Sequence, residues 1–380
     1  MPHVSAADGP GAVPAATAAT PATAAPAAPA ASLPGDRADA GAAHRWFPDG
    51  LDDELLDLDE ASLLRALGRP TLIRIPGEGT QPPRALSVLL HGDESTGLQA
   101  VHRVLRHRRR YPFDLYVVIG NVQAALAPPG FVFRYLDDQE DFNRVWGLDS
   151  PATDQRRAAD AILAELRAAA PESVIDIHNN TGDNPFYAIL TRVEPRSLTL
   201  ATLFTTTILR WDLEAATMME ALNDVATTAA VECGLPGRPE SLAFAIDGVR
   251  RYLAAPPLDD AGAVADHDLL GGLVKVTVDP AARFRFGGLL DADHDLVLRP
   301  DADVHNFVEV PTGHVLGAIH PGAPLPLRAV DARGRDVTAE HLAVADGEVA
   351  LRRTSVPVMM TRTVAATRKD CLFYLATETG

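Results

Sequence analysis

A histidine and a glutamate follow a short apolar run in the first third of the sequence. The run 87–90 ends at His91, and Glu94 follows three residues later, within His91-Gly92-Asp93-Glu94-Ser95-Thr96-Gly97. Imidazole nitrogen and carboxylate oxygen are both good ligands for a divalent transition metal. A His-x-x-Glu pair alone is weak evidence, because most such pairs are ordinary surface residues. A catalytic metal centre would also need a third ligand, a base and a group that binds the substrate.

A second histidine, His178, ends another apolar run, Ser173–His178. Parallel strands that end at the same edge of a sheet can bring ligands to one ion. His91, Glu94 and His178 would leave one coordination position open, which is typical of catalytic zinc. Manganese, iron and cobalt are not excluded by these ligand types. Asp176 lies two residues before His178 on the same strand face, so it could hold the imidazole in place.

Predicted strands and helices alternate around these residues. We expect strands over 71–75, 85–90, 115–119, 173–178, 187–190 and 206–209, and helices over 96–108, 153–170 and 239–253. Thr153 is a predicted N-cap, and Pro171 ends that helix. The alternation predicts an α/β fold with a mostly parallel or mixed sheet flanked by helices. Short alternating runs such as 274–278 and 348–351 predict a β-rich domain after Pro256-Pro257.

The sequence is therefore divided into three predicted segments: a disordered Ala/Pro-rich tail over 1–42, a catalytic domain over 43–258 and a β-rich domain over 259–380. The formal net charge of −17 argues against nucleic acid or an anionic membrane as a partner. Cys233 and Cys371 are the only cysteines, which favours a reducing, cytoplasmic compartment and leaves any metal to His, Asp or Glu. We expect neither a signal peptide nor a membrane span. Whether the chain forms a homo-oligomer stays open.

Several segments, taken in order, resemble the succinylglutamate desuccinylase/aspartoacylase family of zinc hydrolases, which shares its fold with the zinc carboxypeptidases. Beside the two segments that contain His91 and His178, the similar ones are Gly120-Asn121-Val122-Gln123-Ala124, Arg134-Tyr135, Asp141-Phe142-Asn143-Arg144, Val231-Glu232-Cys233-Gly234 and Asn306-Phe307-Val308-Glu309-Val310-Pro311-Thr312-Gly313. The resemblance covers roughly residues 70 to 320. The ordered set is far more specific than any one segment.

The resemblance implies a role for each of these residues. His91, Glu94 and His178 would bind one Zn²⁺ per chain. Glu232 would be the general base, which takes a proton from water and delivers one to the leaving amine. The remaining residues would act on the substrate: Arg134 at the oxyanion, Asn143 and Arg144 at a carboxylate, and Asn179 and Asn180 in the pocket wall.

Two departures from the family pattern bear on these roles. Two extra residues separate Arg134 from Asn143 relative to the usual spacing, which weakens the role of Arg134 more than that of Arg144. The segment 179–185 also differs from the sequence found in either named enzyme. Because this segment would line the pocket, the resemblance names neither the acyl group nor the amine.

We expect a zinc-dependent hydrolase that cleaves the linear, non-peptide amide bond of an N-acyl amino acid or a similar small carboxylated amide. A zinc carboxypeptidase acting on peptides is the alternative, and the β-rich domain, as a cap over the site, argues against it. A metal-binding scaffold without catalysis is a third hypothesis, disfavoured by the intact Glu232 and the open coordination position; a functional Glu232 is favoured because a glutamate is expensive to bury in a strand without a purpose. Glu309 is an alternative base, Glu240 is expected in a first helical turn, and His102 and His107 are expected to be exposed.

Overall fold

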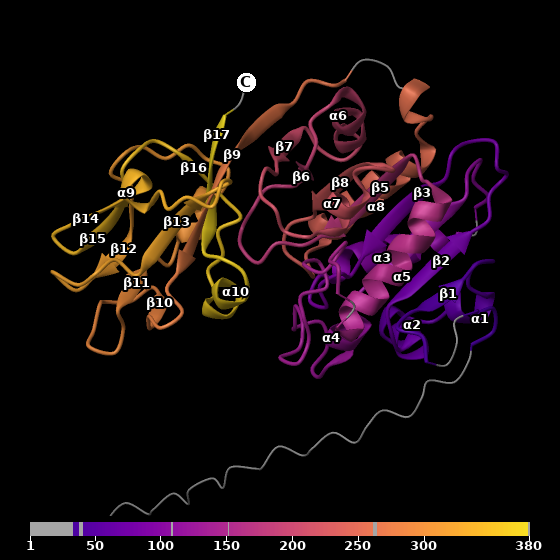
Figure 1. The fold of residues 1–380 in the computed structure, drawn as a ribbon, viewed down its shortest axis with the longest axis horizontal. Helices are drawn as coiled ribbons and strands as arrows, with labels where there is room; N and C mark the ends of the chain where they lie inside the picture. Colours follow the sequence, from indigo (N-terminus) through magenta and orange to yellow (C-terminus); the bar gives the residue numbers. More distant parts are fainter. Residues whose placement is uncertain (1–32, 38–40, 108, 151, 261–263, 379–380) are drawn as a thin grey trace, which may run out of the picture. The chain divides into compact units, whose positions relative to one another are not determined.

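The computed structural model describes residues 33–37, 41–107, 109–150, 152–260 and 264–378, all within one unit, Ser32–Gly380 (Figure 1). Residues 1–32 and 38–40 of the predicted tail lie outside the described residues. The boundary at 258/259 stays a prediction.

The described residues form a twelve-stranded sheet, and its mixed character was predicted from the sequence. Its strand order is β1 (Arg45–Phe47), β2 (Thr71–Ile75), β4 (Leu115–Ile119), β3 (Arg84–Val88), β5 (Ser173–His178), β8 (Thr227–Glu232), β6 (Tyr187–Leu190), β7 (Thr207–Arg210), β9 (Asp268–Val278), β17 (Phe373–Glu378) and β16 (Val356–Val358), with β13 (Leu327–Asp331) paired to β9. The central strands β4, β3, β5 and β8 are parallel to one another, whereas β2 and β6 flank them in the antiparallel sense. The carboxyl ends of β3, β5 and β8 therefore meet at one edge of the sheet.

Helices cover both faces of this central part. The helices are α1 (Asp53–Leu56), α2 (Glu60–Leu67), α3 (Ser95–Leu105), α4 (Val122–Leu126), α5 (Asp154–Ala169), α6 (Pro195–Thr202), α7 (Met218–Leu222) and α8 (Pro239–Ala254). Alternate residues of the strands supply two separate cores. Ile175 and Ile177 pack with apolar residues of α3 and α8, whereas Val174 packs with α5 and α7. Asp176 and His178 follow Val174 at intervals of two, so they share the face covered by α5 and α7.

The chain after residue 257 is β-rich, as predicted. A five-stranded sheet has the order β10 (Phe284–Phe286), β11 (Leu296–Leu298), β12 (Val315–Ile319), β15 (Glu348–Leu351) and β14 (Leu342–Ala345). The remaining elements are short: η1 (Leu258–Asp260), η2 (Ala302–His305), α9 (Thr338–His341) and α10 (Val364–Lys369). The long strand β9 pairs with β7 in parallel and with β17 and β13 in antiparallel (Figure 1). This pairing makes the C-terminal strands a continuation of the main sheet.

Some element boundaries differ from those predicted. The strand expected to reach residue 90 ends at Val88, because Leu89 takes a φ of 60° and turns the chain toward His91. Thr153 is the N-cap of α5, as predicted, and accepts a hydrogen bond from the Arg156 backbone N–H. His102 was wrongly expected to be exposed: it is buried, with Nε2 3.0 Å from the Leu56 carbonyl oxygen. No helix in the described part of the chain is long and apolar enough to cross a membrane.

Candidate active site

All nine predicted site residues line one cavity of about 580 Å³. Six of them lie at the carboxyl edge of the parallel strands, in the loops after β3 and β5 and in the last residues of β5 and β8; the segment between α4 and α5 supplies the other three: Arg134, Asn143 and Arg144. The predicted strand ends thus lie together. Glu309 is exposed and outside the lining of this cavity, and Glu240 is exposed in the first turn of α8, as expected.

The turn after β3 is held close to α4. Gly92 allows this approach, because a Cβ there would lie 2.5 Å from the Ala125 backbone nitrogen. His91 precedes this glycine, and Glu94 is the residue just before α3. Gly97, in the first turn of α3, lets the helix approach β5, since a Cβ would lie 2.9 Å from Ile177 Cγ2. Glycines at these positions therefore hold both candidate ligands against the end of β5.

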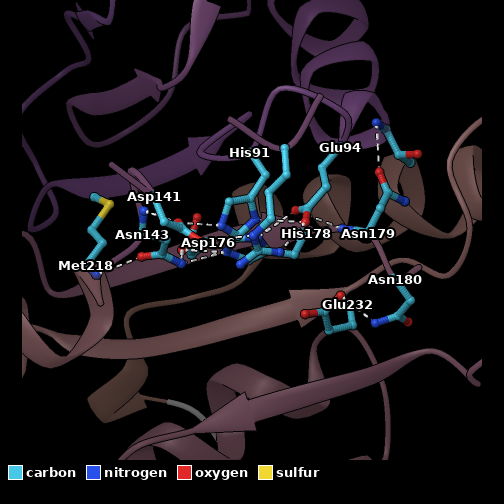
Figure 2. Close-up of polar contacts among 12 residues, drawn as sticks. His91, Glu94, Asp141, Asn143, Asp176, His178, Asn179, Asn180, Met218 and Glu232 are labelled. Atoms are coloured by element: carbon cyan, nitrogen blue, oxygen red, sulfur yellow. Dashed lines mark hydrogen bonds and ion pairs between the residues drawn. The ribbon is translucent and has the colours of Figure 1, made fainter. Parts of the chain in front are cut away.

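His91, Glu94 and His178 form a buried group that could hold a metal ion, with ligand atoms within 4.8 Å of one another. His91 Nδ1 lies 2.8 Å from Glu94 Oε1, and His178 Nδ1 lies 2.7 Å from Glu94 Oε2. Figure 2 shows both imidazoles turned toward the Glu94 carboxylate. Three donors of this kind leave room for a fourth ligand.

The far nitrogen of each imidazole meets a second carboxylate. His91 Nε2 lies 3.0 Å from Asp141 Oδ1, and His178 Nε2 lies 2.7 Å from Asp176 Oδ2. The contact between Asp176 and His178 was predicted from their spacing. The contact of Asp141 was not, because Asp141 lies in an irregular segment where no periodicity places its side chain. Its one signal was its place in the Asp-Phe-Asn-Arg segment.

These contacts test whether the residues suit a metal cation. A neutral imidazole carries one N–H, so with a carboxylate at both nitrogens one lone pair would face a negative oxygen. A cation between the two Nδ1 atoms and Glu94 removes this conflict, and the aspartates then accept the Nε2 protons. The donor set fits a divalent ion of the zinc type.

The electrostatics of the cluster agree with this assignment. Burial and then Arg134 would lower the pKa of His91, but the carboxylates of Glu94 and Asp141 outweigh both and raise it. Burial would raise the pKa of Glu94, but His91 and His178 hold it well below its usual range. Glu94 is therefore ionised at neutral pH, the form in which a carboxylate binds a metal.

Glu232 ends β8 directly beside His178, its register partner on β5. Burial, with Glu94 nearby, raises the pKa of Glu232 to about 7. Asn180 Nδ2 donates to Glu232 Oε2 at 2.8 Å and to the Tyr187 hydroxyl at 3.1 Å. A buried carboxylate with a pKa near neutrality, held beside candidate metal ligands, has the properties of a general base.

The two arginines hold different positions in the cavity. Arg134 Nε donates to Asp141 Oδ2 at 2.9 Å, and its Nη1 lies 3.7 Å from Glu94 Oε1. Arg134 is thus beside the candidate metal ligands, despite the unusual spacing in the sequence. Arg144 Nη2 lies 3.4 Å from Asp370 Oδ2.

Like Asn180, the other two asparagines of the site are engaged within the protein. Asn143 Oδ1 accepts from the Met218 backbone N–H at 3.0 Å, and its Nδ2 lies 3.3 Å from Asp176 Oδ2. Asn179 Oδ1 accepts from the Thr96 backbone N–H at 3.1 Å, and its Nδ2 donates to the Gly234 carbonyl at 2.8 Å. Both amides therefore position the cluster.

The C-terminal segment also reaches the cavity. Lining residues from this segment include Met359, Thr361, Thr363, Ala365, Ala366, Lys369, Asp370, Cys371 and Tyr374. Lys369 Nζ donates to the Tyr135 carbonyl at 2.6 Å, and Lys275 Nζ to Asp370 Oδ1 at 3.1 Å. Sequence reasoning missed Lys369 and Asp370, because no spacing relates them to residues more than 200 positions earlier in the chain.

No protein-family model matches the chain, and no curated protein matches its sequence. Among solved structures, succinylglutamate desuccinylase from Vibrio parahaemolyticus matches with a TM-score of 0.54 at 15% identity, over 81% of this chain and 86% of that chain. A succinylglutamate desuccinylase/aspartoacylase from Rhodobacter sphaeroides matches with a TM-score of 0.52 at 17% identity, over 81% and 89%. The ectoine utilization protein EutE (DoeB) from Ruegeria pomeroyi, in a product-bound structure, has a TM-score of 0.50 at 17% identity, over 80% and 88%. The chain therefore has the fold of the succinylglutamate desuccinylase/aspartoacylase structures.

Proposed function

We propose that this protein is a zinc-dependent amidohydrolase that removes the acyl group from an N-acyl amino acid or a similar small carboxylated amide. The observation that carries the proposal is the pairing of His178 with Glu232 at adjacent strand ends, which puts a candidate metal ligand beside a buried base. The fold likeness to desuccinylase/aspartoacylase structures supports the same reaction class. A cytoplasmic location remains a prediction from the cysteine content, and the oligomeric state stays open.

His91, Glu94 and His178 would hold the ion. A Zn²⁺ held there would polarise the scissile carbonyl and lower the pKa of water. Glu232 takes a proton from the water molecule that attacks the carbonyl carbon, and then delivers the proton to the leaving amine. Arg134, beside Glu94, donates to the oxyanion that develops on the carbonyl oxygen.

Arg144 binds the carboxylate of the amino-acid half, since a guanidinium can pair with it bidentately. Asn143 was expected to bind the same carboxylate; we propose instead that it positions Arg144, because the Asn143 amide oxygen accepts from the Met218 backbone N–H and ties this segment to the start of α7. Asn180 orients Glu232, and Asn179 orients the loop after β5. The cavity is also lined by α10 and the residues around it. Because these residues restrict access to the cavity, a small substrate is favoured over a peptide, and a carboxypeptidase activity is the less favoured alternative.

The test combines metal analysis with a hydrolysis screen of acetyl, succinyl and aspartyl amino acids. We expect one zinc per chain and release of a free amino acid. Glu232→Gln should keep the zinc and lose roughly 10²–10⁴-fold in kcat, the typical contribution of a general base. Full activity in this variant would refute the assigned base. Zinc without turnover of any acyl amino acid would instead favour a non-catalytic metal protein.

A further inference from the structure

Apolar side chains lie on the same strand face as His178 and Glu232. On β8, Ala230 precedes Glu232 by two residues, so both point to one face. Ala230 pairs with Ile189 of β6, and Glu232 pairs with Tyr187. Paired residues of neighbouring strands share a face. Ile189 and Ala230 therefore lie on the side of the sheet that carries the candidate metal ligand and base.

These residues form an apolar floor, which we define as Ile189, Trp211, Met219 and Ala230. All four line the 580 Å³ cavity and are 2–7% exposed. Met219 follows Met218, whose backbone N–H donates to Asn143. Figure 2 shows Asn143 and Met218 on one side of His178; Glu232 and Asn180 lie on the other side. The apolar floor thus extends from the base toward the Asn143–Arg144 pair.

The cations that line the cavity in the described residues each contact another group. Arg134 pairs with Asp141, Arg144 with Asp370, and Lys369 Nζ donates to the Tyr135 carbonyl. The apolar floor itself contributes only neutral groups. Its polar atom is Trp211 Nε1, a donor without a partner in the described part of the chain, which could bond a hydroxyl but does not neutralise a carboxylate.

We propose that the apolar floor binds the side chain of the amino-acid half of the substrate, and that the enzyme acts on N-acyl derivatives of apolar amino acids such as leucine, methionine and phenylalanine. This inference rests on the proposed function. With the amine at Glu232 and the α-carboxylate at Arg144, the side chain lies over Ala230 and Met219. An aspartate or glutamate side chain there would be desolvated beside apolar groups, and none of the four floor residues carries a positive charge.

The test compares kcat/KM of the zinc-loaded protein for the N-acetyl derivatives of leucine, phenylalanine, aspartate and glutamate. We expect the apolar substrates to be preferred by roughly ten- to a hundredfold, as for other apolar pockets. Preference for aspartate or glutamate would overturn the inference and leave the proposed function standing. No hydrolysis of any acyl amino acid would overturn the proposed function itself.

Two variants sharpen the comparison. Met219→Lys adds a cation to the apolar floor and should lower the leucine-to-aspartate ratio of kcat/KM by at least tenfold. Met219→Leu should keep the preference for the leucine derivative. The ratio of two substrates in one sample does not depend on the folded fraction. Calorimetric titration of zinc-loaded Glu232→Gln with N-acetylphenylalanine and N-acetylaspartate gives a readout without turnover. Tighter binding of N-acetylaspartate would contradict the proposal.

Discussion

His178 and Glu232 are direct register partners at the ends of the parallel strands β5 and β8. Neighbouring strands lie about 4.8 Å apart, so the backbone ladder fixes the separation of the candidate metal ligand and the candidate base. His178 is further held by Asp176, and Glu232 by Asn180. The candidate ligand and the candidate base are therefore positioned by the rigid sheet, whereas Arg134 and Arg144 lie in the irregular segment between α4 and α5.

The hydrogen bond from Asn180 to Glu232 predicts a specific pH dependence. Glu232 must be ionised to accept a proton, and burial raises its pKa to about 7, so activity should be lost as the pH falls. A bound metal cation lowers this pKa, which places the acid limb at or below about pH 7. Asn180 donates to the charged form, so Asn180→Ala should raise the pKa and move the acid limb of kcat/KM to higher pH.

The pH–rate profile separates this positioning role from a purely structural one. Asn180→Ala should be impaired more at pH 6 than at pH 9, with zinc content unchanged. Uniform loss of activity at every pH, without a shift of the limb, would show that Asn180 does not act through Glu232. Asn184→Ala, in the same segment and outside contact with Glu232, serves as the matched control.

The two aspartates behind the imidazoles should control metal affinity. Asp141 and Asp176 accept from the Nε2 atoms of His91 and His178, respectively. Asp141→Asn and Asp176→Asn should each weaken zinc binding by about 10–100-fold, as for other partners of metal-bound histidine. Competition with a chromophoric chelator measures the affinity. Unchanged zinc affinity in both variants would argue against His91 and His178 as ligands.

The candidate ligands His91 and His178 could be predicted from the sequence because each follows or ends an apolar strand, and parallel strands bring such ends together. The role of Glu232 was predicted from the resemblance of its segment to the family. Asp141 and Asp370 do not follow the strand rule, because they lie in irregular segments where only the tertiary fold places a side chain. The burial of His102 was missed for a related reason: charged neighbours in its helix suggested solvent, whereas α1 and α2 cover it. The apolar floor depends on the β6–β8 register, which the sequence does not specify.

Arg144 should act on substrate binding more than on the chemical step. It is partly exposed in the cavity and pairs with Asp370 at 3.4 Å. A hydrogen bond to a charged group contributes about 1.5–3 kcal/mol, so Arg144→Ala should raise KM by roughly 10–100-fold with a smaller change in kcat. Arg167→Ala is the control, because Arg167 lies on α5 and forms an exposed ion pair with Asp224. A large fall in kcat at unchanged KM would place Arg144 at the reacting carbonyl instead.

Gly92 links the stability of the fold to the geometry of the candidate metal site. An added Cβ would lie 2.5 Å from the Ala125 nitrogen and 2.7 Å from the Ala124 carbonyl carbon, so the backbone of α4 or of the turn must move. Gly92→Ala should lower the free energy of unfolding by about 1–3 kcal/mol, the usual effect of overpacking. Because His91 is the preceding residue, zinc affinity should fall as well.

Gly41→Ala, where no atom lies within 4 Å of the added Cβ, should change stability by less than about 0.5 kcal/mol. Urea denaturation in the presence of a chelator measures the effect without the contribution of bound metal. Equal stability of the two variants would show that α4 can yield to the added methyl group.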